Sequence, residues 1–219
     1  MRLNIILASG WGFDYRFWKP LASELSEFKL YYDSRNYFDD HAANIAISQP
    51  TIGVGHSMGL SRLVNKYSHN PHMVGFVSIC GFLKFSRASS ELFAQNTAMQ
   101  ANFARAPVRV LRAFYRQCNL GCWPYIPVKY KELSHDLNLL NSLDIQPPTQ
   151  PLLALNATKD RILKMEFQKK LLFAPNNCIR TIDAGHALGY QYPQECANYI
   201  RKFIYEFGLA QDTTFLRAS

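Results

Sequence analysis

Ser57 lies in the pentapeptide Gly55-His56-Ser57-Met58-Gly59, which matches the pattern G-x-S-x-G. A serine hydroxyl attacks a carbonyl only when a nearby base removes its proton. The five residues alone favour a plain glycine-rich turn. However, an apolar stretch at 51–55 precedes them and a helical pattern runs on to residue 67, the context of a sharp turn that presents a nucleophile. The flanking glycines are expected because side chains there would collide with the neighbouring strand and helix.

His186 is the histidine best placed to act as the base. It occurs in Asp183-Ala184-Gly185-His186-Ala187, directly after the last predicted strand and before Pro193 and the final predicted helix. His56 adjoins the serine in the chain, so we expect its side chain to point away from the hydroxyl. An ordinary loop histidine is the alternative for His186. The other histidines lie in polar stretches without a placement signal: His41, His69, His72 and His135.

Asp160 is the candidate for the acid that orients the histidine. It lies in a polar turn after the apolar stretch 152–156, and the resulting chain order is serine, acid, histidine. That order distinguishes one class of serine hydrolases from two others with the same triad. Asp183 is the rival, but only three residues separate it from His186, which makes it less able to brace the imidazole from behind.

The oxyanion donors are expected to be backbone amides. The first predicted strand ends in Ser9-Gly10-Trp11-Gly12, and glycines there allow the backbone to approach a substrate closely. A loop after an early strand and the residue after the nucleophile supply the two donors in this class of enzyme. That assigns the oxyanion hole to Trp11 and Met58. Simple packing is the alternative role for Trp11.

Apolar runs alternate with helical patterns along the chain, which predicts an α/β fold with a mostly parallel, doubly wound sheet. The stretch 82–150 interrupts this alternation, lacks a good strand and contains several prolines. We therefore expect a hydrolase core at 1–81 and 151–219 with a small helical cap insertion at 82–150. Strands are predicted at 3–8, 29–32, 51–55, 74–80, 152–156 and 179–182. Helices are predicted at 17–25, 40–47, 57–67, 166–173 and 195–207.

These motifs resemble the α/β-hydrolase superfamily over nearly the whole chain. Within it, the sequence is similar to the esterases of biotin synthesis that cleave the methyl ester of pimeloyl-[acyl-carrier protein]. The similarity lies in Gly10-Trp11-Gly12, Phe17-Trp18, Ser57-Met58-Gly59, Gly185-His186-Ala187 and Tyr192-Pro193. It implies that Trp11, Ser57, Asp160 and His186 do the chemistry. The family usually has His-Gly where this chain has Ser9-Gly10.

The insertion carries a candidate binding surface for an acidic partner. Arg105, Arg109, Arg112 and Arg116 follow one another at intervals of four, three and four residues, which would place them on one face of a helix. Like charges at this spacing repel one another, so an anionic partner would relieve a cost. Pro107 requires the helix to begin near it or to kink. The family resemblance implies an acyl carrier protein as the partner; a solvated basic face is the alternative.

Composition sets broader limits. The 219 residues suffice for one core, and the formal net charge is +8. No apolar run is long enough for a membrane span, and the five cysteines have no metal or redox spacing, so we expect reduced thiols in a cytoplasmic protein. We also expect a monomer without a metal or cofactor. Nucleic-acid binding has only the charge in its favour, because no nucleic-acid motif accompanies it.

The sequence thus predicts a serine carboxylesterase that hydrolyses an acyl methyl ester. A general short-chain carboxylesterase or thioesterase would use the same triad. A binding protein on a hydrolase scaffold, without catalysis, is the alternative from another class. Fold alone does not choose among them.

Overall fold

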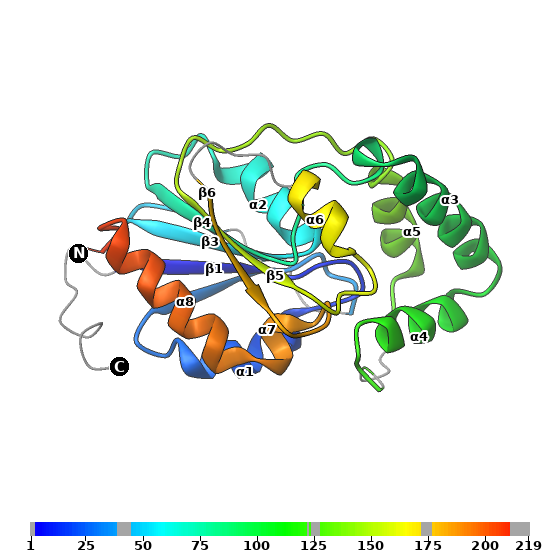
Figure 1. The fold of residues 1–219 in the computed structure, drawn as a ribbon, viewed down its shortest axis with the longest axis horizontal. Coiled ribbons are helices and arrows are strands. Elements are labelled where there is room, and N and C mark those ends of the chain that lie inside the picture. The colour runs from blue at the N-terminus through cyan, green and yellow to red at the C-terminus, as the bar shows by residue number, and fades with distance from the viewer. Residues whose placement is uncertain (1–2, 39–44, 122, 124–127, 172–176, 211–219) are drawn as a thin grey trace.

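The computed structural model describes residues 3–38, 45–121, 123, 128–171 and 177–210. Its centre is a six-stranded, entirely parallel sheet with the strand order β2-β1-β3-β4-β5-β6 (Figure 1). All six predicted strands are confirmed. They are β1 (Asn4–Ala8), β2 (Lys29–Asp33), β3 (Thr51–His56), β4 (Met73–Ile79), β5 (Leu152–Ala157) and β6 (Asn177–Ile182).

Burial explains why the central strands are so apolar. Every residue of β1, β3 and β5 is buried, as expected where helices cover both faces of a parallel sheet. The edge strands differ. In β2 the side chains are exposed or half-buried except at its last residue, and Ile179 in β6 is 47% exposed.

Helices flank the sheet on both faces, with α2 and α6 on one side and α1, α7 and α8 on the other (Figure 1). Their bounds are α1 (Lys19–Glu24), α2 (Met58–Tyr67), α6 (Met165–Leu171), α7 (Leu188–Gln191) and α8 (Pro193–Glu206). A 3₁₀ turn, η1 (Tyr15–Trp18), leads into α1, so the predicted helix at 17–25 is in two parts. The helix predicted at 40–47 falls partly outside the described residues, and residues 45–47 are not helical.

In the described part of the segment between β4 and β5 there are three α-helices: α3 (Ser90–Arg105), α4 (Pro107–Gln117) and α5 (Tyr130–Leu139). They gather at one end of the sheet, beyond the carboxyl ends of its strands (Figure 1). The base of this cap is pinned where Lys84 and Asp144 form an isolated antiparallel bridge. On its far side, buried Asp136 of α5 accepts hydrogen bonds from Arg35 and Tyr37, which follow β2.

The strand order creates a natural place for a site. The chain passes from β1 outward to β2, then returns across β1 to β3 and builds the rest of the sheet in the opposite direction. Ligands of open α/β sheets bind outside the carboxyl ends of the strands at such a reversal. Here the reversal lies between β1 and β3, whose ends carry Trp11 and Ser57.

Candidate active site

Ser57 occupies the sharp turn between β3 and α2. Its backbone has φ 52° and ψ −126°, a left-handed conformation that a non-glycine residue adopts at a cost of about 1–3 kcal/mol. The two flanking glycines are required sterically. A Cβ on Gly55 would lie 2.4 Å from the backbone of Leu60 in α2, and one on Gly59 would lie 2.0 Å from the carbonyl oxygen of Ala8 in β1. The predicted collisions with helix and strand are therefore confirmed.

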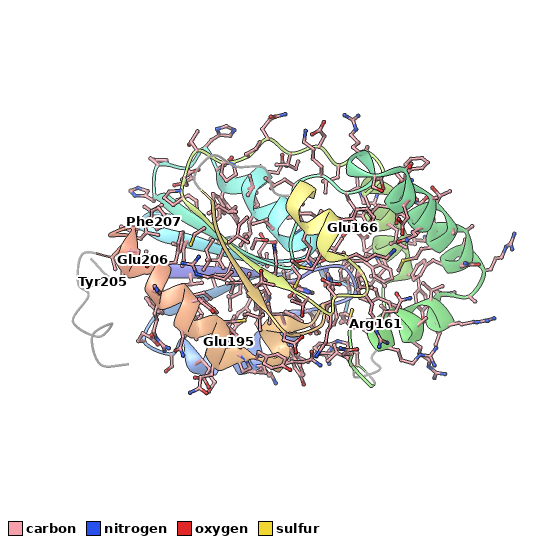
Figure 2. All side chains as sticks on the ribbon, viewed as in Figure 1. Arg161, Glu166, Glu195, Tyr205, Glu206 and Phe207 are labelled. Carbon is pink, nitrogen blue, oxygen red and sulfur yellow. The ribbon has the colours of Figure 1, made fainter. Side chains whose placement is uncertain are left out.

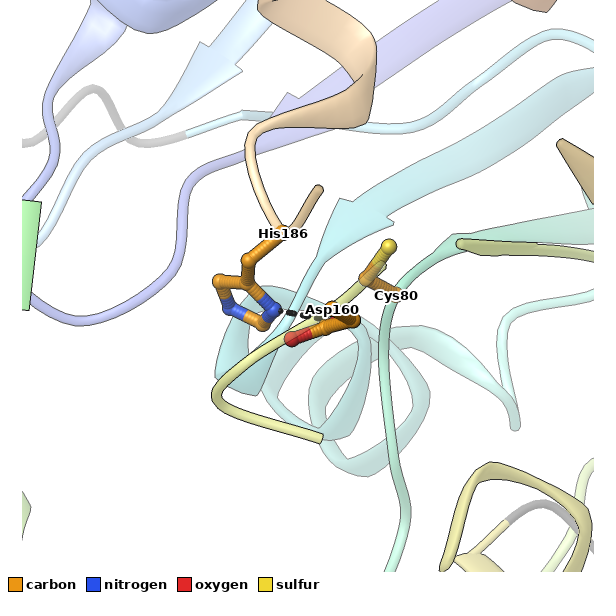
Figure 3. Close-up of side chains that lie close together, drawn as sticks. All are labelled: Cys80, Asp160 and His186. Atoms are coloured by element: carbon orange, nitrogen blue, oxygen red, sulfur yellow. Dashed lines mark hydrogen bonds and ion pairs between the residues drawn. The ribbon is translucent and has the colours of Figure 1, made fainter. Parts of the chain in front are cut away.

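Asp160 and His186 meet in the interior. The imidazole Nδ1 of His186 lies 2.7 Å from a carboxylate oxygen of Asp160, and both side chains are fully buried (Figure 3). The other carboxylate oxygen of Asp160 accepts the backbone N–H groups of Ile162 and Leu163, each at 2.8 Å. This double anchor fixes the carboxylate, and a carboxylate facing Nδ1 places the ring proton there. Nε2 of His186 is left as the basic nitrogen.

The rival acid is directed elsewhere. Asp183 has a side chain that is 70% exposed, and it accepts hydrogen bonds from Thr158 at 2.8 Å and Lys159 at 2.7 Å. Those partners hold the pKa of Asp183 below its ordinary value. Only Asp160 is in position to orient His186.

The candidate base and the candidate nucleophile are not joined by a hydrogen bond. Nε2 of His186 is buried and has no hydrogen-bond partner among the described residues, Ser57 included. Such bonds are often long in ligand-free enzymes and tighten when substrate binds.

A cavity of about 480 Å³ opens onto the nucleophile. Its floor includes Ser57, Trp11 and Met58, and its walls are mostly apolar side chains of the cap, such as Phe114 and Leu140. The ring of Phe114 also lies 6.5 Å from that of His186, centroid to centroid. The cap therefore supplies an apolar chamber next to the catalytic candidates. Arg161, which follows Asp160, adds an exposed cation to its lining on the side facing α4 (Figure 2).

The loop after β1 is held closely against the nucleophile. A Cβ on Gly10 would lie 2.8 Å from the Cβ of Ser57, so only glycine fits there. Arg62 of α2 donates to the Ser9 carbonyl at 3.0 Å, and Tyr115 of the cap donates to the Gly12 carbonyl at 2.7 Å. Sequence reasoning missed both anchors, because neither belongs to a local motif.

Trp11 has two roles in this loop. Its indole N–H donates to the carbonyl of Leu133 in α5 at 2.8 Å, and its ring packs edge-on against Phe114. The side chain thus ties the loop to the cap, and Trp11 is among the residues that line the cavity. Met58 is the first residue of α2, and the first amides of a helix have no carbonyl partner within it. Both candidate oxyanion donors therefore border the cavity that contains the serine.

The four cap arginines do not share one helix. Arg105 is the last residue of α3. Ala106, with φ −148° and ψ 66°, is not helical, and Pro107 begins α4. The prediction of a single face is wrong for Arg105, because the residue before a proline avoids helical geometry. Arg109, Arg112 and Arg116 do lie together and line a surface hollow of about 500 Å³. None of the four forms an ion pair within the described ranges.

A thiol lies beside the acid–histidine pair. Ligand atoms of Cys80, Asp160 and His186 are all within 4.8 Å of one another (Figure 3). Burial, reinforced by the charge of Asp160, raises the pKa of Cys80 well above its ordinary value. A metal would require the thiolate and would compete with Asp160 for Nδ1. The chemistry of this group favours a neutral thiol packed behind the pair. Cys80, Cys118, Cys178 and Cys196 are free thiols, and Cys122 lies outside the described residues.

Comparison with known proteins places this geometry in a known fold. No protein-family profile and no curated protein matches the sequence. An esterase from Exiguobacterium antarcticum superposes with a TM-score of 0.71 at 10% identity, covering 94% of this chain and 92% of the esterase. The chain has the α/β-hydrolase fold. MenH from S. aureus gives a TM-score of 0.69 at 12% identity over 94% of both chains.

A third neighbour is described as an α/β-hydrolase enzyme from a Medee basin deep-sea metagenome library, with a TM-score of 0.68 at 14% identity. It covers 93% of this chain and 89% of its own. Among the described helices, none combines the length and apolarity that spanning a bilayer requires.

Proposed function

We propose that this chain is a serine carboxylesterase in which Ser57, His186 and Asp160 form the catalytic triad. The observation that carries the proposal is the buried 2.7 Å hydrogen bond between Asp160 and His186, at the same end of the sheet as a serine in a strained strand-to-helix turn. This pair joins the loop after β5 to the loop after β6 in the protein interior. It is the arrangement that makes a serine hydroxyl reactive.

The steps follow from the geometry. Ser57 attacks the ester carbonyl as Nε2 of His186 accepts the hydroxyl proton, and Asp160 stabilises the imidazolium that forms. The Trp11 and Met58 amides donate to the oxyanion, and each lowers the activation barrier by on the order of 3 kcal/mol. His186 then protonates the leaving alcohol. Water hydrolyses the acyl-enzyme by the same steps in reverse.

A fluorophosphonate probe tests the triad directly, because it reacts only with an activated serine. We expect wild-type protein to be labelled and Ser57→Ala to remain unlabelled. Absence of labelling in the folded wild-type protein would favour the alternative of a binding protein on a hydrolase scaffold. Hydrolysis of p-nitrophenyl acetate should follow the same pattern.

We further propose an acyl methyl ester on an acidic carrier protein as the substrate, specifically the pimeloyl-[acyl-carrier protein] methyl ester of biotin biosynthesis. Arg109, Arg112 and Arg116 support this, because three cations around one hollow lack acidic partners in the described part of the chain. They lie on α4, whose other side lines the serine cavity through Val110 and Phe114. A phosphopantetheine arm from a protein docked there would have a short path to Ser57.

Charge reversal separates this substrate from a small ester. The double variant Arg109→Glu with Arg112→Glu should raise KM for a carrier-bound methyl ester while sparing p-nitrophenyl acetate. The matched control is Lys29→Glu with Lys202→Glu, which makes the same charge change at exposed positions outside the cap. Equal losses on both substrates would contradict carrier docking and favour the general esterase or thioesterase.

A genetic test addresses the pathway itself. The wild-type gene should restore growth of an esterase-deficient biotin auxotroph, and the Ser57→Ala gene should fail to do so. Rescue by neither gene, with esterase activity intact in vitro, would confine the proposal to the general enzyme.

A further inference from the structure

The imidazole of His56 is buried directly behind the nucleophile turn. It is 0% exposed and stacks on Phe17 with ring centroids 4.3 Å apart. Phe13 and Trp18 meet it edge-on at 5.5 and 6.5 Å. A polar ring enclosed by three aromatic side chains must have its hydrogen bonds satisfied by specific partners or carry a cost.

One of those partners belongs to the catalytic loop. Nε2 of His56 lies 3.0 Å from the backbone carbonyl oxygen of His186, which is 130 residues further along the chain. A carbonyl oxygen can only accept, so the proton of the neutral His56 ring must be on Nε2. Its Nδ1 is buried and has no partner among the described residues.

His56 is also held in the uncharged form. Burial, and after it the charge of His186, lower its pKa well below the ordinary value, although the hydrogen bond to the His186 carbonyl opposes them. The two rings are only 4.8 Å apart, centroid to centroid. A neutral His56 therefore puts no second cation beside the imidazolium that His186 becomes during attack.

These contacts divide the restraint of His186 between two neighbours. Asp160 fixes its side chain at Nδ1, while His56, the last residue of β3, holds its main chain. We propose that His56 is a positioning residue of this site: its Nε2–H holds the backbone carbonyl of His186 and so aims the base at Ser57. The inference rests on the proposed esterase function and adds a residue to it.

The experiment separates the hydrogen bond from packing. His56→Leu removes the donor, His56→Gln retains an N–H donor, and Phe17→Leu disturbs the same ring stack but leaves the hydrogen bond in place. With p-nitrophenyl acetate, His56→Leu should lower kcat by about 10–100-fold and leave KM within about threefold, because misplacing a catalytic group slows chemistry more than binding. His56→Gln should recover part of kcat. Phe17→Leu should stay within about threefold of wild type.

A readout independent of activity accompanies these rates. Hydrogen–deuterium exchange of residues 183–188 should become faster in His56→Leu and remain near wild type in Phe17→Leu. Equal effects of the two variants on kcat and on exchange would overturn the proposal and reduce His56 to core packing. If wild-type protein is not labelled by fluorophosphonate, the esterase proposal fails, yet the exchange comparison still decides whether His56 holds the loop.

A measurement on the wild-type protein covers the case in which His56→Leu does not fold. Nitrogen-15 NMR of the His56 ring should show the neutral, Nε2-protonated form between about pH 5 and 8, although free histidine titrates in that range. A neutral ring with its proton on Nδ1 would overturn the proposal, because the carbonyl of His186 would then lack its donor.

Discussion

Replacing Asp160 with asparagine is the most informative single change at this site. One carboxylate oxygen accepts the amides of Ile162 and Leu163, and the other faces Nδ1 of His186. The asparagine oxygen should keep the two amide bonds, which leaves its NH₂ group facing the imidazole. Nδ1 must then accept, so the ring proton moves to Nε2. In that form His186 cannot take the proton of Ser57.

The expected loss is large because nothing replaces the carboxylate. Both side chains are fully buried, so water cannot restore the correct tautomer. The equivalent change in a serine protease triad lowers kcat by about 10⁴. We expect a fall of about 10³–10⁴ here, or roughly 4–5.5 kcal/mol at about 1.36 kcal/mol per tenfold. The fold should persist, since the amide bonds to the loop remain.

The assay is steady-state hydrolysis of p-nitrophenyl acetate, with circular dichroism as the check on folding. Asp183→Asn is the matched control: it makes the same chemical change in the rival carboxylate, 70% of which is exposed. Asp183 makes its hydrogen bonds to Thr158 and Lys159 rather than to His186, so its replacement should change kcat less than about twofold. The exposed ion pair that it loses contributes only about 0–1 kcal/mol to stability. The reasoning is refuted if Asp160→Asn keeps more than a tenth of wild-type kcat, or if Asp183→Asn is the variant that loses activity.

Two further predictions concern the scaffold beneath the site. Gly59→Ala should lower the free energy of unfolding by about 3 kcal/mol or more, because its Cβ would lie 2.0 Å from the carbonyl oxygen of Ala8. The control is Gly53→Ala, whose Cβ would lie 3.0 Å from a side chain and which should cost about 1 kcal/mol. Urea unfolding measures both. Asp33→Asn should cost about 2 kcal/mol at neutral pH, because it leaves the half-buried Arg62 without its charged partner. Burial raises the pKa of Asp33, but its ion pairs outweigh burial and lower it below 3.8. This stabilisation is therefore present above pH 3.8 and lost as the pH falls through the lowered pKa, so the two proteins should converge in unfolding free energy at acidic pH. A constant difference across pH would contradict the assignment.

The sequence by itself predicted the features that follow from local rules. Residues 51–67 carry a strand pattern, a flanked serine and a helix pattern, and each is set by neighbours in the chain. The glycines at 55 and 59 could be explained before the structure because their collisions are with the elements that every such turn brings together. Alternating apolar and helical stretches likewise predicted the parallel sheet, since burial on both faces requires continuous apolar runs.

The tertiary structure decided what depends on contacts between distant segments. Asp160 and Asp183 are both polar residues on loops after strands, and only packing shows that one is enclosed against His186 while the other faces solvent. Two hydrogen bonds have no local pattern in the sequence that would predict them. His56 bonds to a carbonyl 130 residues away, and Tyr115 donates to the Gly12 carbonyl in the loop after β1. Side-chain periodicity encodes which face of an element is buried. It does not encode which distant residues that face will contact, and those contacts decide the chemistry of this site.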